Sequence, residues 1–205
     1  MSFFAFLLAA VVLAITPGPG IAYVVARTVA GGRAEGLASC IGTGLGGLLH
    51  VLAAAVGLSL LIAQSALAFS VVKYLGSAYL VYLGLRLLMR RDHDIAAGTV
   101  TPQGARRALL EGIVVEALNV KTALFFLAFL PQFTTPDGPL VPQLVLLGSL
   151  CVLLNTLVDV VAVLAAHRLT RSGVTRAARA RLMTRVSGTM LLGLGAFLAS
   201  ARRQA

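Results

Sequence analysis

Helix-breaking residues interrupt the first long apolar stretch of the chain, where they could expose backbone groups to a ligand. The stretch contains Thr16-Pro17-Gly18-Pro19-Gly20. A proline in a helix interior removes a backbone donor and costs about 3 kcal/mol, so this composition predicts an unwound segment. Unwound backbone at membrane depth occurs where protein buries it or water reaches it, and transporters bind substrates there. We therefore expect Thr16, Pro17, Gly18 and Pro19 to bind substrate; the alternative is a structural kink.

Polar residues also lie deep in the fourth apolar stretch, which contains Glu116-Ala117-Leu118-Asn119-Val120-Lys121. A Lys or Asp at the bilayer centre costs about 2.5–3.5 kcal/mol on insertion scales, so an intramembrane charge indicates a functional site. We interpret Asn119 and Lys121 as substrate ligands. The alternative for Lys121 is a purely structural role, either paired with an acid or reaching a lipid headgroup.

The fifth apolar stretch carries Asn155 and Asp159, which are four residues apart and share one helical face. A deep carboxylate must be paired, protonated or in contact with water. Both residues are predicted to face the substrate, and Asp159 is also a candidate proton carrier, together with Glu116 and His50. The alternatives for Asp159 are a neutral structural side chain or an ion pair with Lys121.

The composition places these residues in a membrane. The 205 residues are 59% hydrophobic and only 12% charged, whereas about a quarter of an ordinary soluble domain is charged. The mean hydropathy of +0.94 excludes a water-soluble domain. The length fits about six helices of about 20 residues, so we expect an all-α polytopic protein, with residues 1–205 as one integral membrane domain. The predicted segments are 3–26, 37–63, 69–88, 109–131, 142–166 and 186–201.

Basic residues cluster in alternate loops of this scheme. The net charge is +10, and arginines concentrate in 27–36, 89–108 and 167–185. The positive-inside rule therefore predicts that these loops are cytoplasmic and that the N-terminus lies outside. Six spans would also put the C-terminus outside, where Arg202 and Arg203 do not fit the rule. Five spans plus a re-entrant sixth segment remain open. A nucleic-acid partner is excluded, because no basic face carries interleaved aromatic residues.

The two halves show a weak internal similarity. Lys73-x-x-Gly76-Ser77 and Arg185-x-x-Gly188-Thr189 each open an apolar run. We therefore predict an inverted repeat of three helices plus three, with half-repeats at about 1–90 and 105–205 and with helices 1 and 4 broken, an arrangement typical of secondary transporters. Gly42-x-x-x-Gly46 predicts a close helix-packing face.

Other function classes lack their residues. The ATP-binding pattern GxxxxGK[ST] does not occur, so transport would draw on an ion gradient. An intramembrane hydrolase is the alternative, but the sequence offers neither a metal-binding HExxH nor a recognisable nucleophile and base. We therefore predict no enzyme activity, no cofactor and no metal.

Several ordered motifs resemble the LysE/RhtB family of bacterial amino-acid exporters. They are Thr16-Pro17-Gly18-Pro19, Gly42-Thr43-Gly44-Leu45-Gly46 with His50, Gly57-Leu58-Ser59, Lys73-x-x-Gly76-Ser77-Ala78-Tyr79-Leu80-x-Tyr82-Leu83-Gly84, Asn119-x-Lys121-Thr122-Ala123-Leu124-Phe125-Phe126 and Pro131-Gln132-Phe133. The resemblance implies a multi-pass inner-membrane exporter of amino acids or close derivatives, driven by antiport with protons, with inverted repeats and a homodimer.

This chain departs from the family pattern at two positions. Gly20 stands where many relatives have a polar residue after Pro-Gly-Pro, and Val120 stands where many have a proline between Asn119 and Lys121. Gly20 removes a polar contact that could bind substrate. Val120 removes a helix breaker, so the resemblance implies a milder break in the fourth segment. Both departures bear on which amino acid is carried.

Overall fold

The computed structural model describes residues 3–58, 101–135 and 138–170, with isolated positions between 67 and 89 and residue 196. These residues form helices and short connections, and no strand occurs among them. The predicted all-α class is therefore confirmed for this part of the chain. The predicted segments 69–88 and 186–201 lie largely outside the described residues, so the six-span count and the inverted repeat stay predictions.

The first predicted segment, 3–26, contains a break where its prolines lie. Helix α1 (Phe3–Ile15) ends before Thr16, and helix α2 (Pro19–Ala53) begins after Gly18. Gly18 has an extended backbone, with φ −136° and ψ −172°. Pro19 opens α2 at the position where its missing N–H would have no helical partner anyway. The predicted unwound segment is thus confirmed, and it is three residues long.

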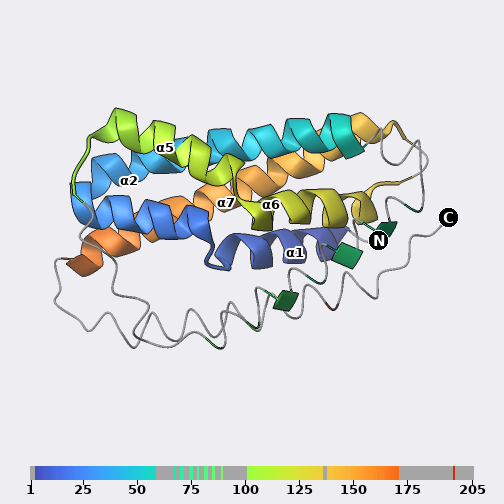
Figure 1. The fold of residues 1–205 in the computed structure, drawn as a ribbon, viewed down its shortest axis with the longest axis horizontal. Helices are drawn as coiled ribbons and strands as arrows, with labels where there is room; N and C mark the ends of the chain where they lie inside the picture. The colour runs from blue at the N-terminus through green and yellow to red at the C-terminus, as the bar shows by residue number, and fades with distance from the viewer. Residues whose placement is uncertain are drawn as a thin grey trace.

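Helix α2 turns back on itself at a single glycine. Gly32 has φ 77° and ψ −169°, a conformation that glycine adopts without a steric cost. The two arms, 19–31 and 33–53, lie side by side, since a Cβ on Gly20 would stand 3.9 Å from Cγ2 of Thr43 (Figure 1). The predicted loop at 27–36 is therefore wrong in its extent, because both arms remain helical up to the turn. A π-helical turn, η1 (Ala54–Leu58), continues the second arm.

The fourth predicted segment is also broken. Helix α5 (Ala105–Ala117) is followed by a short helix α6 (Val120–Leu124), a π-helical turn η3 (Phe125–Phe129) and a 3₁₀ turn η4 (Leu130–Phe133). The two parts bend by 44° at the break. Helix α7 (Leu140–Thr170) is continuous. The described residues offer two helical stretches long and apolar enough to cross a membrane, Pro19–Gly57 and Leu140–Arg168, and the bent pair adds a third.

Glycines bring the second arm of α2 close to two neighbours. A Cβ on Gly42 would meet the carbonyl oxygen of Leu109, and one on Gly46 would stand 2.6 Å from the carbonyl oxygen of Ile113. The predicted Gly42–Gly46 packing face is thus confirmed, with α5 as its partner. On another side of the same arm, a Cβ on Gly44 would stand 3.1 Å from Oγ1 of Thr156 in α7, and one on Gly47 would stand 3.0 Å from Cγ2 of Val152.

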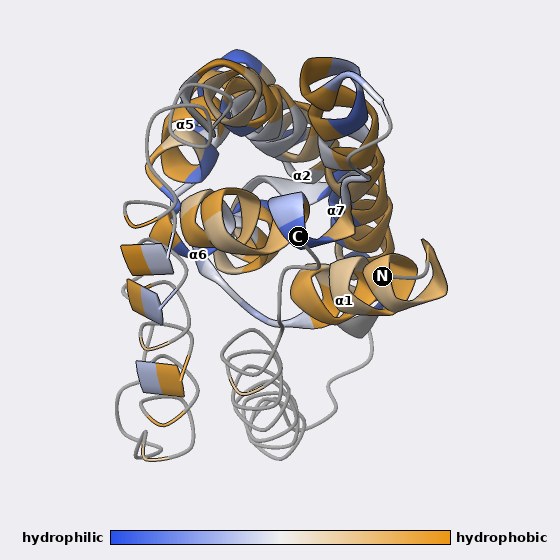
Figure 2. Ribbon diagram, turned by 90° about the vertical axis from the view of Figure 1, so that its right-hand side faces the viewer, coloured by the Kyte–Doolittle hydropathy of each residue, from blue (hydrophilic) through white to orange (hydrophobic). Residues whose placement is uncertain are grey.

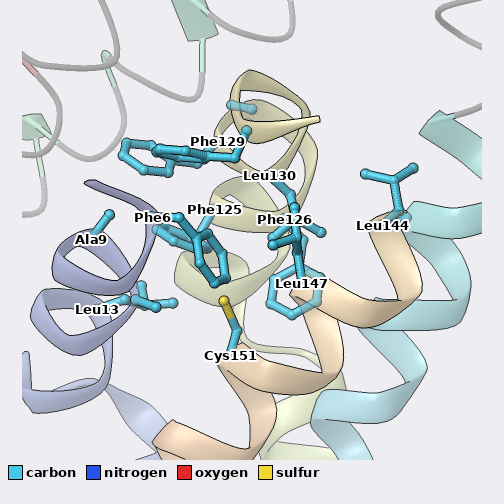
Figure 3. Packing of buried hydrophobic residues seen from close by; sticks show 14 of the residues in the cluster. Phe6, Ala9, Leu13, Phe125, Phe126, Phe129, Leu130, Leu144, Leu147 and Cys151 are labelled. Carbon is cyan, nitrogen blue, oxygen red and sulfur yellow. The ribbon is translucent and has the colours of Figure 1, made fainter. Parts of the chain in front are cut away.

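An aromatic cluster joins the remaining elements. Phe6 of α1 packs with Phe125, Phe126 and Phe129 of η3 and with Leu147 of α7 (Figure 3). The rings of Phe125 and Phe129 stack with centroids 4.8 Å apart. Large apolar side chains such as Phe4, Leu8 and Leu146 are exposed, as expected for contact with lipid, and Figure 2 shows apolar residues along much of α1, α6 and α7. The polar residues named above therefore lie in an otherwise apolar structure.

The described parts of the three basic stretches, 27–36, 101–108 and 167–170, lie at the same end of the molecule. Figure 1 shows the turn of α2, the start of α5 and the end of α7 at one end, and the N-terminus and the start of α7 at the other. This arrangement agrees with the prediction that the stretches share one side of the membrane.

Candidate functional site

Lys121 bridges the breaks in the two broken segments. Its ammonium donates hydrogen bonds to the carbonyl oxygens of Leu13 at 3.2 Å and Thr16 at 2.8 Å. In a continuous helix the N–H four residues later would use each carbonyl. Pro17 has no N–H, so it leaves the Leu13 carbonyl free for Lys121. A Cβ on Gly18 would stand 3.0 Å from the Lys121 nitrogen, which explains a residue without a side chain there.

Asn119 organises the break in the fourth segment. Its side-chain oxygen accepts a hydrogen bond from the backbone N–H of Lys121 at 3.1 Å, which caps α6. Its amide nitrogen donates to Oε2 of Glu116 at 2.9 Å. Oε1 of Glu116 accepts from the hydroxyl of Thr122 at 2.7 Å. Glu116 is only 1% exposed, and these neutral donors hold its carboxylate at the break.

Asp159 has a hydrogen-bond partner other than Lys121. Its Oδ2 accepts a hydrogen bond from the Thr43 hydroxyl at 2.9 Å, and its Oδ1 has no hydrogen-bond partner among the described residues although the residue is 0% exposed. In the described ranges the ion pairs are Arg27–Glu35 and Arg107–Glu111. The predicted alternative of a Lys121–Asp159 ion pair is therefore wrong, because each side chain has its own polar partners.

His50 contacts the broken segment through its backbone. Nε2 lies 2.8 Å from the carbonyl oxygen of Glu116. A carbonyl only accepts, so Nε2 carries the proton and donates. Of the predicted proton carriers, His50 and Glu116 thus meet at the break, and Asp159 lies on α7 beside Thr43.

A small cavity lies among α1, α2, α5, α6 and α7. Its polar lining residues are Thr43, Glu116, Thr122, Asn155 and Thr156, and Leu13 adds an apolar wall. The volume is about 10 Å³, which is the space of about one water molecule. Among the described residues, this cavity is smaller than any amino acid. Of the predicted site residues, Asn155 and Glu116 line this cavity, and Thr16, Gly18 and Lys121 gather at the break in the first segment.

Sequence reasoning missed the threonines of this cavity and a buried cluster at the turn of α2. Arg27 and Glu35 are 3.6 Å apart there. Oε1 of Glu35 accepts from the backbone N–H groups of Gln103 at 2.8 Å and Gly104 at 2.7 Å, just before α5. In the sequence, Arg27 and Glu35 look like ordinary loop charges. The signal that could have found them is that Glu35 is a lone acid among arginines and glycines.

Comparison with known proteins decides the family. The family model of the LysE type translocator matches residues 11–202. The chain belongs to the LysE family of translocators. Its members are transport proteins, so this LysE-family protein is a transporter rather than an enzyme, and the resemblance found in its motifs is confirmed.

Named relatives of this LysE-family protein point to amino-acid efflux. It is 32% identical to an uncharacterized membrane protein of Vibrio cholerae, covering 97% of this chain and 96% of that one. It is 31% identical, over the same shares, to the homoserine/homoserine lactone efflux protein of Salmonella typhimurium. It is 30% identical to the leucine efflux protein of the same organism, covering 68% of this chain and 66% of that one. No solved structure matches. These relatives and the apolar helices make it a multi-pass protein of the bacterial inner membrane.

Proposed function

We propose that this protein exports an amino acid or a close derivative across the inner membrane in exchange for protons. The observation that carries the proposal is Lys121, a buried ammonium bound to the carbonyl oxygens of Leu13 and Thr16 where the first helix is broken. Glu116 lies across the same break, 2.7 Å from where a Cβ of Gly20 would stand. A zwitterion needs one group of each sign, and the two breaks supply both.

The carboxylate of the substrate meets Lys121 in this proposal. Two of the three ammonium protons are used by the carbonyls of Leu13 and Thr16, so the third remains for a ligand. The N-terminus of α2 begins beside it at Pro19, and the N-cap residue Gly18 has no side chain that could cap the helix. A helix N-terminus favours an anion. Because Gly18 and Gly20 have no side chains, neither residue blocks the approach of the substrate carboxylate to Lys121.

Asp159 carries the proton in this proposal. A fully buried carboxylate with one hydroxyl partner and one unpartnered oxygen is expensive as an anion and cheaper once protonated. Thr43 links it to the cavity that Glu116 and Asn155 line. Asp159 can therefore alternate between a protonated and an ionised state, as the exchange of a proton for substrate requires. The cytoplasmic side of the proposal is the end that holds the basic stretches.

The test is uptake into proteoliposomes that contain the purified protein, driven by an imposed pH gradient. Radiolabelled homoserine and leucine are the probes, because efflux of these amino acids names two of the relatives. We expect a proton gradient to drive one of them against its concentration gradient. Lys121→Ala serves as the variant without the carboxylate ligand and should transport neither. Equal uptake by liposomes with the wild-type protein, with Lys121→Ala and with no protein would contradict the proposal.

A further inference from the structure

We propose that the small cavity beside Glu116 is a binding site for a monovalent cation, either the ammonium group of the substrate or a free alkali ion. The ligands are the Glu116 carboxylate and the hydroxyl oxygens of Thr43, Thr122 and Thr156. The ammonium form rests on the proposed function, whereas the alkali form does not.

The hydroxyl protons of the three threonines are all directed elsewhere. Thr156 donates to the carbonyl oxygen of Val152 at 2.9 Å, and Thr122 donates to Glu116 at 2.7 Å. Thr43 has the carbonyl oxygen of Cys40 at 3.0 Å and Asp159 at 2.9 Å as acceptors. A hydroxyl has one proton and two lone pairs. With its proton committed, each hydroxyl offers only lone pairs to the cavity.

The charge of the cavity lining also favours a cation. Among the described residues that line the cavity, Glu116 is the one ionisable carboxyl or amine, and Lys121 is not one of them. The amide of Asn155 can turn its oxygen inward. A lining of acceptors around a buried carboxylate disfavours anions and attracts a cation or a strong donor. Oxygen ligands of this kind also suit alkali ions.

The size of the cavity limits what can enter. A volume of about 10 Å³ holds a single ion or an ammonium head but no complete amino acid. Leu13 lines the cavity, and its carbonyl oxygen accepts from Lys121. Leu13 therefore contacts both the cation site and the Lys121 ammonium. A substrate with its ammonium in the cavity could extend toward Lys121 with its carboxylate.

The experiment measures thermal unfolding of the purified protein in detergent, without transport. Sodium chloride, potassium chloride and methylammonium chloride are compared at equal ionic strength with choline chloride, whose cation is too large to enter. We expect sodium or methylammonium to raise the Tm above the choline value. A rise with an alkali ion identifies an ion site, and a rise with methylammonium alone identifies the substrate's head group; both support the proposal.

Variants tie the rise to the cavity. Thr156→Val and Thr122→Val keep the shape and remove a ligand oxygen, so each should weaken the cation's apparent affinity by about tenfold. Thr28→Val is the matched control, because buried Thr28 also donates to the carbonyl four residues earlier, at 2.8 Å, but does not line the cavity. Equal Tm values in all four salts would overturn the proposal. A rise that survives both Thr156→Val and Thr122→Val would overturn it as well.

Discussion

At the scale of single residues, the two deep opposite charges are held by different partners. Lys121 is bound to carbonyl oxygens of the first segment, and Asp159 is bound to Thr43. The sequence could predict that both are buried, because each lies in an apolar run. It could not predict their partners, since Lys121 lies 105 positions from Thr16 and Asp159 lies 116 positions from Thr43.

The different hydrogen-bond partners of these two charges predict that the loss of one is not rescued by the loss of the other. Lys121→Met should lower the free energy of unfolding, because two buried carbonyls lose their donor at about 1–3 kcal/mol each. Asp159→Asn in the same chain should not restore it. Their coupling in a double-mutant cycle of thermal unfolding should stay well below the about 3–5 kcal/mol that breaking a buried ion pair costs. Recovery of wild-type stability in the double mutant would instead demonstrate an ion pair.

Proton exchange at Asp159 makes a separate prediction. Asp159→Asn keeps the shape and the acceptor for Thr43 but removes the titratable group. Export should then lose its response to an imposed pH gradient, while binding of the substrate survives. The measurement is efflux from proteoliposomes with and without the gradient, with wild-type protein alongside. A variant that still follows the gradient would show that the proton travels through Glu116 or His50.

At the scale of helices, the sequence predicted where helices break more accurately than it predicted the connections between them. Four breakers at 17–20 predicted the end of α1, and Asn119 caps α6 even though Val120 replaces a proline. The turn of α2 was beyond sequence reasoning, because one glycine with positive φ replaces the loop expected at 27–36. Hydropathy cannot distinguish such a turn from a longer connection.

The break in the first segment should be necessary for export. In the double variant Pro17→Ala with Pro19→Ala, residue 17 regains an N–H that can bond the carbonyl of Leu13. That bond would compete with Lys121, so we expect normal membrane insertion and strongly reduced efflux. Insertion is followed by membrane fractionation and export by counterflow in proteoliposomes. Full export by the double variant would mean that the prolines only bend a packing helix.

The glycine face of α2 should tolerate no side chain. Gly42→Ala places a Cβ against the Leu109 carbonyl oxygen, and the forced separation from α5 should cost about 1–3 kcal/mol. Gly57→Ala is the control, because a Cβ at Gly57 meets nothing within 4 Å. Thermal unfolding in detergent compares the two. Equal Tm values would refute close contact between α2 and α5.

At the scale of the whole molecule, the arrangement of the ends makes the topology testable. Arg33 lies at the turn of α2 and Thr135 lies just after η4, at opposite ends of the structure, and both are exposed. In a background without Cys40 and Cys151, a membrane-impermeant maleimide applied to intact cells should label Thr135→Cys and spare Arg33→Cys. Permeabilised cells should label both. External labelling at position 33 alone would invert the proposed orientation.

Two π-helical turns among the described residues have a consequence for how this chain can change in length. A π turn holds one residue more than an α turn needs, and the chain has such a surplus at Ala54–Leu58 and again at Phe125–Phe129. Loss of one residue there would restore an ordinary helix rather than interrupt it. Because the π turn already accommodates its extra residue, the helix beyond would keep its orientation, and Phe133 would stay in the aromatic cluster. A single-residue deletion should therefore be tolerated in either turn, whereas the same deletion in a regular α-helical stretch would rotate everything beyond it by about 100°.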